Sequence, residues 1–163
     1  MIEVEKKYEV TNEQFAEVFD KVILIGDHLA TETLTDLIFN IDRVEQGYNF
    51  DRIRLKNINV DQIEFERKSW IGDNRVEIPI ECEVVEKKRM TYDLGSYKIM
   101  LDRFIDRYFI EIEMLTDNPE EVPNLEDKII KIAKELIDGE LIKAPSYLSM
   151  VLDNHELVED ILG

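Results

Sequence analysis

The sequence predicts an α+β protein built around one antiparallel sheet. Two segments with helical spacing, near the start and in the last quarter, flank a long middle region in which apolar and polar residues alternate. Short turns separate the alternating segments, as they do in antiparallel meanders. No Pro/Gly/Ser-rich linker and no low-complexity tract divides the 163 residues, so we expect a single domain covering 1–163.

The elements can be placed in order along the chain. MIEVEKKYEV opens it as a strand, and Thr11 to Gln14 then form a capping-box pattern ahead of a helix that ends near Gly26. Apolar residues at helical spacing from Asn124 predict a second long helix, closed by Gly139. A short helical tail is expected around residues 147–152. Between the two long helices, alternation predicts strands within residues 48–56, 58–70, 75–90, 97–104 and 106–115.

Composition limits the classes of function. The formal charge of −17 argues against general nucleic-acid binding, which needs a basic surface. Cys82 is the only cysteine, which excludes an intrachain disulfide, and its alternation with Ile80 and Val84 predicts a buried strand thiol. No run of about 18 apolar residues predicts a membrane helix. We therefore expect a cytoplasmic protein with no nucleic-acid or membrane partner, acting as a monomer or homodimer.

Every predicted strand has one ionic and one apolar face, because alternate side chains point to opposite sides of a sheet. In the first strand Glu3, Glu5 and Lys7 share a face, opposite Ile2 and Val4. The later strands place these residues on their ionic faces: Arg52, Arg54, Glu64, Glu66, Lys68, Arg75, Glu77, Glu81, Glu83, Lys87, Arg89, Lys98, Asp102, Glu111 and Glu113.

Two architectures fit this pattern. In an open sheet the apolar face packs on helices and the charged face lies in water, which is the usual arrangement. In a closed sheet the strands curl shut with the charges inside, and helices cover the apolar outside. From alternation alone both remain open.

Three observations favour the closed sheet. Bulky apolar residues occupy one face of nearly every strand, while the helices that could cover them lie at both ends of the chain. Glu-x-Glu recurs at 3/5, 64/66, 81/83 and 111/113, which is unfavourable unless a cation is shared. Arg-x-Arg at 52/54 and Lys-x-Arg at 87/89 keep basic groups apart from these acids. Such segregation suits a metal–polyanion ligand, in which carboxylates hold Mg²⁺ or Mn²⁺ and Arg and Lys bind phosphate.

Taken together, these motifs resemble the CYTH family, the triphosphate tunnel metalloenzymes. The resemblance rests on the N-terminal Glu-x-Glu-x-Lys, the Arg-x-Arg, a later strand-borne lysine, LDRFIDRYFIEIE and the final SYLSMVL, and it covers nearly the whole chain. That family includes inorganic triphosphatases, thiamine triphosphatases and class IV adenylate cyclases. The resemblance implies an antiparallel eight-stranded closed β-barrel, a tunnel with a charged interior that is covered outside by helices.

The resemblance also implies roles for individual residues, with Mg²⁺ or Mn²⁺ as the cofactor and Lys7 and Glu111 as the catalytic residues. The metal would be held by Glu3, Glu5, Glu77, Asp102, Glu111 and Glu113. The triphosphate would be bound by Lys7, Arg52, Arg54, Lys68, Lys87 and Arg89.

Three features depart from the family pattern. Pro79 stands where the family often has a second glutamate after Glu77, and because proline donates no ladder hydrogen bond, we expect a bulge or an edge there. TDLIFN resembles the family's Asp-x-Tyr-Tyr-Asp but ends in Asn40, and Glu64 with Glu66 adds negative charge near Lys68. These departures bear on metal affinity and on the identity of the substrate.

The leading expectation is metal-dependent hydrolysis of inorganic tripolyphosphate or of a small organic triphosphate such as thiamine triphosphate. The alternative enzyme is a class IV adenylate cyclase, which replaces the attacking water with the ribose 3′ hydroxyl of ATP and releases pyrophosphate. A third alternative is a non-catalytic triphosphate-binding or nucleotide-binding protein, to which Pro79 gives some weight. The sequence has no Walker loop, so side chains must form the phosphate site.

Overall fold

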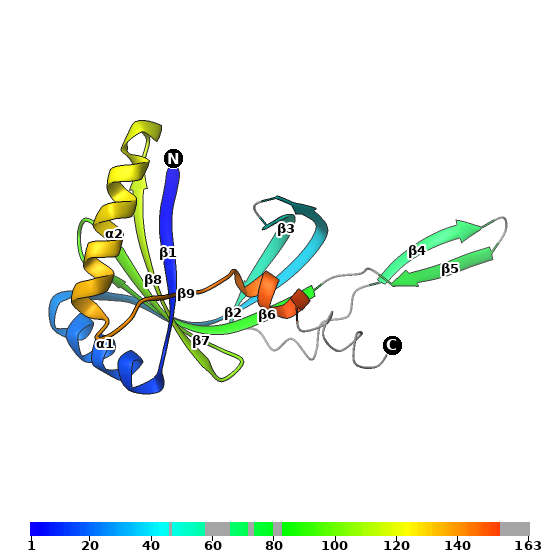
Figure 1. Cartoon of the computed structure of the whole chain (residues 1–163). Helices are drawn as coiled ribbons and strands as arrows, with labels where there is room; N and C mark the ends of the chain where they lie inside the picture. The colour runs from blue at the N-terminus through cyan, green and yellow to red at the C-terminus, as the bar shows by residue number, and fades with distance from the viewer. Residues whose placement is uncertain (46, 58–65, 72–73, 80–82, 154–163) are drawn as a thin grey trace. The chain divides into compact units, whose positions relative to one another are not determined.

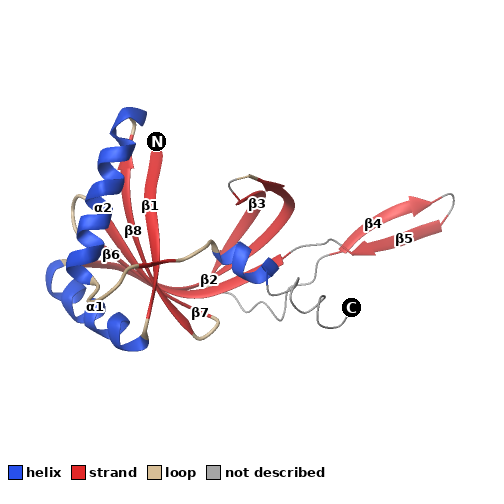
Figure 2. Ribbon diagram, in the orientation of Figure 1, coloured by secondary structure: helices blue, strands red, loops and turns tan. Residues whose placement is uncertain are grey.

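A computed structural model of the chain describes residues 1–45, 47–57, 66–71, 74–79 and 83–153. Helices and strands mix in the α+β manner that the sequence predicts (Figure 2). The helices and strands labelled in Figure 1 are β1 (Ile2–Val10), α1 (Asn12–Ile25), β2 (Asp27–Val44), β3 (Gly47–Lys56), β4 (Glu66–Ile71), β5 (Asn74–Pro79), β6 (Glu83–Asp93), β7 (Lys98–Phe104), β8 (Arg107–Thr116), α2 (Val122–Leu136) and β9 (Ile142–Lys143), and the 3₁₀ helix η2 (Pro119–Glu121) precedes α2. Residues 147–153 are also helical, where the short tail was expected.

The described strands form a seven-stranded sheet in the order β3-β2-β6-β7-β8-β1-β9 and a separate two-stranded sheet, β4-β5. The chain divides into two compact units: the first unit comprises Met1–Thr33 and Lys87–Ser146, and the second comprises Leu34–Glu86 and Tyr147–Gly163. Each unit takes up two separate stretches of sequence. The expectation of a single domain stays a prediction.

In the first unit, β1, β8, β7 and β6 pair antiparallel in register. Helix α1 begins where the capping box predicts, because the Thr11 side chain accepts a hydrogen bond from the Gln14 backbone and the Gln14 side chain accepts one from the Thr11 backbone. It ends at Gly26, whose backbone N–H donates to the Val22 carbonyl. Helix α2 has its own apolar stripe, with Ile129, Ala133 and Leu136 buried.

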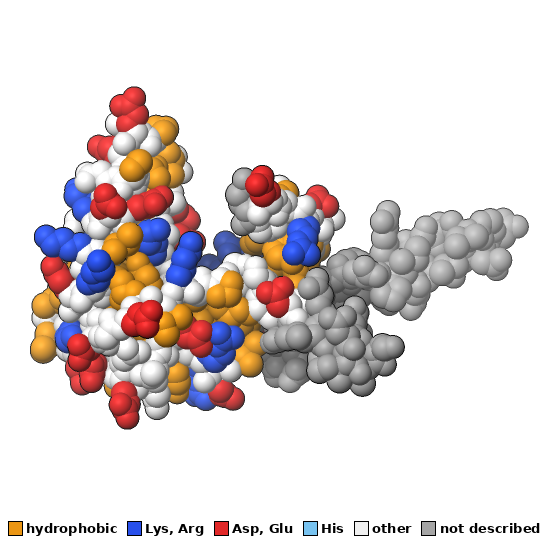
Figure 3. Space-filling view, viewed as in Figure 1, with side chains coloured by type: hydrophobic (Ala, Val, Ile, Leu, Met, Phe, Trp, Pro, Cys, Tyr) orange, Lys and Arg blue, Asp and Glu red, His pale blue; other side chains and the backbone are white. Residues whose placement is uncertain are grey.

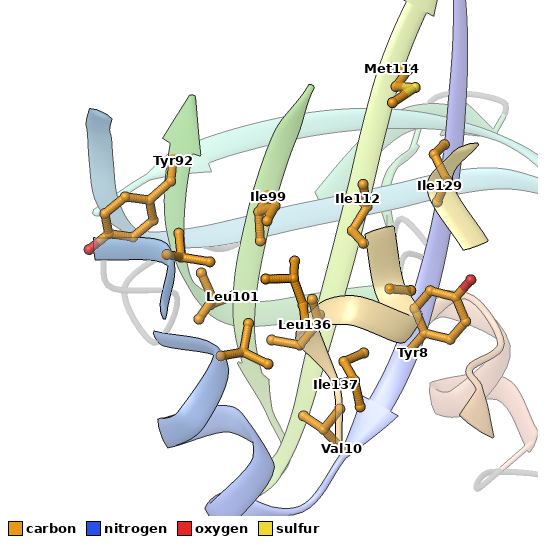
Figure 4. Close-up of a cluster of buried hydrophobic side chains, with 14 of the residues drawn as sticks. Tyr8, Val10, Tyr92, Ile99, Leu101, Ile112, Met114, Ile129, Leu136 and Ile137 are labelled. Atoms are coloured by element: carbon orange, nitrogen blue, oxygen red, sulfur yellow. The ribbon is translucent and has the colours of Figure 1, made fainter. Parts of the chain in front are cut away.

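The apolar face of this sheet packs against both helices to form the core (Figure 4). Ile99, Ile110 and Ile112 of the strands are fully buried, as are Val18 of α1 and Ile129 of α2. The predicted division of β1, β7 and β8 into an apolar and an ionic face is therefore confirmed. The other face of these strands carries Glu3, Glu5, Lys7, Lys98, Asp102, Glu111 and Glu113, whereas Lys6 lies on the helix side, where its Nζ is 3.6 Å from Glu126 Oε2 of α2.

In the second unit, β2 pairs antiparallel with β3, and β4 pairs with β5. Strand β2 is an element that alternation did not predict, because five consecutive residues from 34 to 38 are buried and no period of two results. Asn40 adopts a left-handed backbone conformation (φ 53°), and the β2–β3 register shifts there. Asparagine tolerates this conformation, so the residue that departs from the family pattern forms a bulge.

The predicted closed eight-stranded barrel is wrong for the described residues. Their large sheet has seven strands and two edges, β3 and β9, while β4 and β5 pair with each other in a separate ladder. The reason lies in the strand pairing: β4 and β5 pair with each other, and among the described strands neither adds to an edge of the large sheet, so the ladder does not close. Pro79 ends β5 in this two-stranded ladder, so its expected place on an edge strand is confirmed.

Two further predictions concern membrane helices and Cys82. Within the described ranges, no helix is both long enough and apolar enough to cross a membrane. Cys82, predicted as a buried strand thiol, and Glu64 and Glu81 lie outside the described residues.

Candidate functional site

The ionic face of the first unit arranges predicted site residues in rows that cross the strands. Glu5 of β1 lies opposite Glu113 of β8, which in turn lies opposite Lys98 of β7. The next row places Lys7 opposite Glu111. Directly opposite residues in an antiparallel pair project on the same face, so residues more than 100 positions apart in the chain become neighbours.

Three carboxylates converge at one end of this face. Oxygens of Glu3, Glu5 and Glu113 lie within 4.8 Å of one another. Glu3 and Glu5 are alternate residues of β1, and Glu113 reaches them from β8. Glu3 and Glu5 are exposed and Glu113 is partly exposed, so an ion can enter from solvent. Oxygen ligands of this kind are those that Mg²⁺ and Mn²⁺ prefer.

The crowding of these acids changes their titration. The pKa of Glu5 is raised to about 7, first by loss of hydration and then by the charge of Glu111, with a smaller effect from Glu113. Glu5 is exposed as a residue, yet the neighbouring strands displace enough water from around its carboxyl group to make desolvation the largest cause of this pKa shift. Desolvation and the charges of Glu3 and Glu111 also raise the pKa of Glu113. A bound cation would relieve both effects.

Next to the three acids, an ion-pair chain runs across the sheet. Lys7 Nζ lies 3.6 Å from Glu111 Oε2, and Arg89 Nη2 lies 3.4 Å from the same oxygen. Arg89 in turn donates to both carboxylate oxygens of Asp102, at 2.7 Å from Nε and 2.6 Å from Nη2. Glu111 is thus shared between two cations, while Asp102 holds Arg89 in a planar fork.

Two more basic residues belong to this face. Lys87 lies two residues before Arg89 on β6 and is buried. Lys98 was not among the predicted site residues, although its charge lowers the pKa of Glu113. The proximity of Lys98 to Glu113 depends on the β7–β8 register, in which the two residues lie opposite each other, and the sequence alone does not give this register.

The second unit contains its own basic cluster. Arg54 donates from Nε to Asp36 Oδ1 at 2.7 Å and from Nη2 to Asp36 Oδ2 at 2.8 Å. Arg52 Nη1 lies 3.8 Å from the same Asp36 Oδ2. Asp36 is buried and sits directly opposite Arg54 in the β2–β3 ladder. Asp36 was not among the predicted site residues, and its only signal in the sequence is its place in TDLIFN.

The remaining predicted residues are placed by their backbone alone. Lys68 of β4 lies directly opposite Glu77 of β5. Their side chains lie outside the described part of the structure. Their roles in phosphate and metal binding therefore stay predictions.

The grouping of the three acids contrasts with the exposed surface around the first unit. In the view of Figure 3, Asp and Glu side chains are interspersed with Lys and Arg side chains across the described atoms. Mixed surface charge is the ordinary state of a folded protein.

Comparison with known proteins gives structural relatives. No family model and no curated protein matches the chain. The PH1819 protein of Pyrococcus horikoshii is similar with a TM-score of 0.63 and 23% identity, covering 94% of this chain and 99% of that one. The PH1012 protein of the same organism has a TM-score of 0.55 and 20% identity over 83% and 90%. A proposed adenylate cyclase of Vibrio parahaemolyticus has a TM-score of 0.60 and 16% identity over 94% and 98%.

These similarities show that the chain shares the fold of these proteins over most of its length. At identities below 25% they show the fold alone. The family that the sequence resembles includes adenylate cyclases. The fold shared with the Vibrio parahaemolyticus protein is consistent with that resemblance.

Proposed function

We propose that this chain is a metal-dependent hydrolase of inorganic tripolyphosphate or of a small organic triphosphate. The observation that supports this most directly is the geometry of one sheet face. Three carboxylates lie within 4.8 Å of one another, next to a chain in which Glu111 is shared by Lys7 and Arg89. Binding of a metal–polyphosphate complex requires such an arrangement, in which clustered carboxylates for the metal lie beside basic side chains for the phosphates.

Glu3, Glu5 and Glu113 would hold Mg²⁺ or Mn²⁺. The donor set fits, because all three offer hard carboxylate oxygens, and because desolvation and the charges of neighbouring acids raise the pKa values of Glu5 and Glu113, which a bound cation would oppose. A bound divalent ion would neutralise charge on the phosphate oxygens as the leaving group departs.

Lys7 and Arg89 would bind the phosphate oxygens. Both are mostly buried, with 15% and 11% of their side chains exposed, so their charges act in a medium of lower dielectric constant than water. Arg52 and Arg54 form a second candidate phosphate-binding group in the other unit. Arginine forks match phosphate oxygens in geometry as well as in charge.

Glu111 would orient the attacking water and accept its proton, because it lies between the two cations that hold the phosphates. Attack on the terminal phosphorus forms one P–O bond and breaks the bridging P–O bond. The bridging oxygen leaves with the remaining diphosphate, and the terminal group leaves as phosphate. Lys7 would offset the charge that develops on the transferred group.

Adenylate cyclase activity is the second candidate function, and the similarity to the proposed adenylate cyclase of Vibrio parahaemolyticus favours it. The same groups would serve, with the ribose 3′ hydroxyl of ATP replacing water as the nucleophile. Cyclic AMP and pyrophosphate would then be the products.

A substrate panel tests both functions. Purified protein is incubated with tripolyphosphate, thiamine triphosphate or ATP, each with Mg²⁺ or Mn²⁺, and phosphate and cyclic AMP are measured. Metal-dependent release of phosphate supports the hydrolase, and cyclic AMP formation supports the cyclase. Tight triphosphate binding without turnover would overturn both and indicate a non-catalytic binding protein.

A further inference from the structure

Asp102 is the most thoroughly enclosed charged residue among those described. None of its side chain is exposed, and it lies on β7 directly opposite Arg89 of β6. Arg89 Nε donates to Oδ1 at 2.7 Å and Arg89 Nη2 donates to Oδ2 at 2.6 Å. Each carboxylate oxygen therefore already accepts a short, charge-assisted hydrogen bond.

This environment differs from that of the three clustered acids. Asp102 does not belong to the group formed by Glu3, Glu5 and Glu113. A divalent ion bound to Asp102 would lie beside the guanidinium of Arg89. At such a short distance the two positive charges would repel each other strongly inside a protein. The chemistry of Asp102 thus favours an arginine partner over a metal.

Arg89 connects Asp102 to the rest of the site. Its Nη2 atom, which is fixed by Asp102, also lies 3.4 Å from Glu111 Oε2. The fork fixes the plane of the guanidinium and so directs one edge of it toward Glu111. A side chain held in place before binding loses less conformational entropy when its ligand arrives.

We propose that Asp102 is a positioning residue that holds Arg89 for phosphate binding, and that it does not ligate the metal. This inference rests on the proposed function. It separates two roles within the same face, with metal affinity assigned to Glu3, Glu5 and Glu113 and polyanion affinity depending on Asp102 acting through Arg89.

The test measures two affinities by calorimetry in the full-length protein: Mn²⁺ alone, and tripolyphosphate in the presence of saturating Mn²⁺. Asp102→Asn should leave the Mn²⁺ affinity within about twofold and weaken tripolyphosphate binding by about tenfold or more. Arg89→Lys, which keeps the charge and removes the fork, should give the same pattern. Glu5→Gln should give the reverse pattern, with a larger loss of Mn²⁺ affinity than of tripolyphosphate affinity.

A matched control is available on the same sheet. Arg107 forms a similar fork with Glu9, at 2.7 and 2.6 Å, but on an exposed part of the surface. Glu9→Gln removes a fork of the same kind, and we expect it to change neither affinity. If the effects of Asp102→Asn came from a general loss of ion pairing in the sheet, Glu9→Gln would change the two affinities as well.

A double-mutant cycle tests whether Asp102 acts through Arg89. In an Arg89→Gln background, Asp102→Asn should have no further effect on tripolyphosphate binding, because the residue that it positions is already gone. Arg89→Gln alone removes the arginine partner of the buried Asp102 carboxylate, so its circular dichroism spectrum is first compared with that of the wild-type protein, whereas the double variant removes both charges.

The outcomes separate this inference from the proposed function. A fall of tenfold or more in Mn²⁺ affinity in Asp102→Asn, or unchanged tripolyphosphate binding in that variant, overturns the positioning role alone. Independent effects of Asp102→Asn and Arg89→Gln in the cycle overturn it too. Absence of both tripolyphosphate and thiamine triphosphate binding by the wild-type protein overturns the proposed function, and this inference falls with it.

Discussion

The raised pKa of Glu5 predicts that divalent-metal binding weakens sharply on mild acidification. With a pKa of about 7, this carboxyl group is ionised to about nine tenths at pH 8 and about one tenth at pH 6. Because a metal ion binds the ionised carboxylate, the affinity for Mn²⁺ should fall about tenfold over this range from Glu5 alone. Glu113, whose pKa is also raised, adds to the fall.

The same shift has a definite sign for stability in the absence of metal. Glu5 has a folded-state pKa above its ordinary value of 4.5, so the folded state retains the proton more strongly than the unfolded state does. The stability that this group contributes is complete below pH 4.5 and is lost as pH rises to about 7. Metal binding reverses this effect, because it favours the ionised group. Added Mn²⁺ should therefore raise the melting temperature more at pH 8 than at pH 6.

Calorimetric titration of Mn²⁺ at pH 6, 7 and 8, at constant ionic strength, measures the effect directly. Glu5→Gln should bind more weakly at every pH and show a flatter profile. Glu9→Gln is the matched control, because Arg107 lowers the pKa of Glu9 and this acid stays ionised throughout the range. Equal Mn²⁺ affinity of the wild-type protein at pH 6 and pH 8 would refute the reasoning.

Three further predictions concern turnover and stability. Lys7→Ala, or Glu3→Ala combined with Glu5→Ala, should abolish triphosphate turnover and leave the circular dichroism spectrum unchanged, because these side chains lie on the ionic face, away from the hydrophobic core. Ile112→Ala should lower the free energy of unfolding in urea by about 2–5 kcal/mol, because Ile112 is fully buried between strands and helices. Ile105→Asn should raise the free energy of unfolding by about 1 kcal/mol, because this exposed β-branched residue occupies a left-handed turn at φ 49°.

Each of these predictions has its own control or contrary result. Full activity of purified Lys7→Ala would remove the catalytic assignment. Leu115, on the opposite face of the same strand, is 46% exposed, so Leu115→Ala should cost much less than Ile112→Ala in the same urea titration. A lower melting temperature in Ile105→Asn would show that the turn is not strained as its backbone angles indicate.

Much of the first unit follows from local patterns in the sequence. Alternation identified β1, β6, β7 and β8 but not β9, and the capping box placed the start of α1 at the correct residue. The approach of Glu3 and Glu5 also follows directly, because alternate residues of a strand share a face. These features depend on neighbours in the sequence, which is why a single sequence determines them.

Other features depend on which distant strands pair and in which register. Glu113 joins Glu3 and Glu5, and Arg89 meets Asp102, only because β1, β8, β7 and β6 are aligned as they are. Strand β2 escaped prediction because burial on both faces removes alternation. The closed barrel was an expectation about pairing between distant strands, and the described sheet instead ends in two edges. Local periodicity therefore determined which side chains share a face, whereas long-range backbone hydrogen bonding decided which of those faces and charges meet.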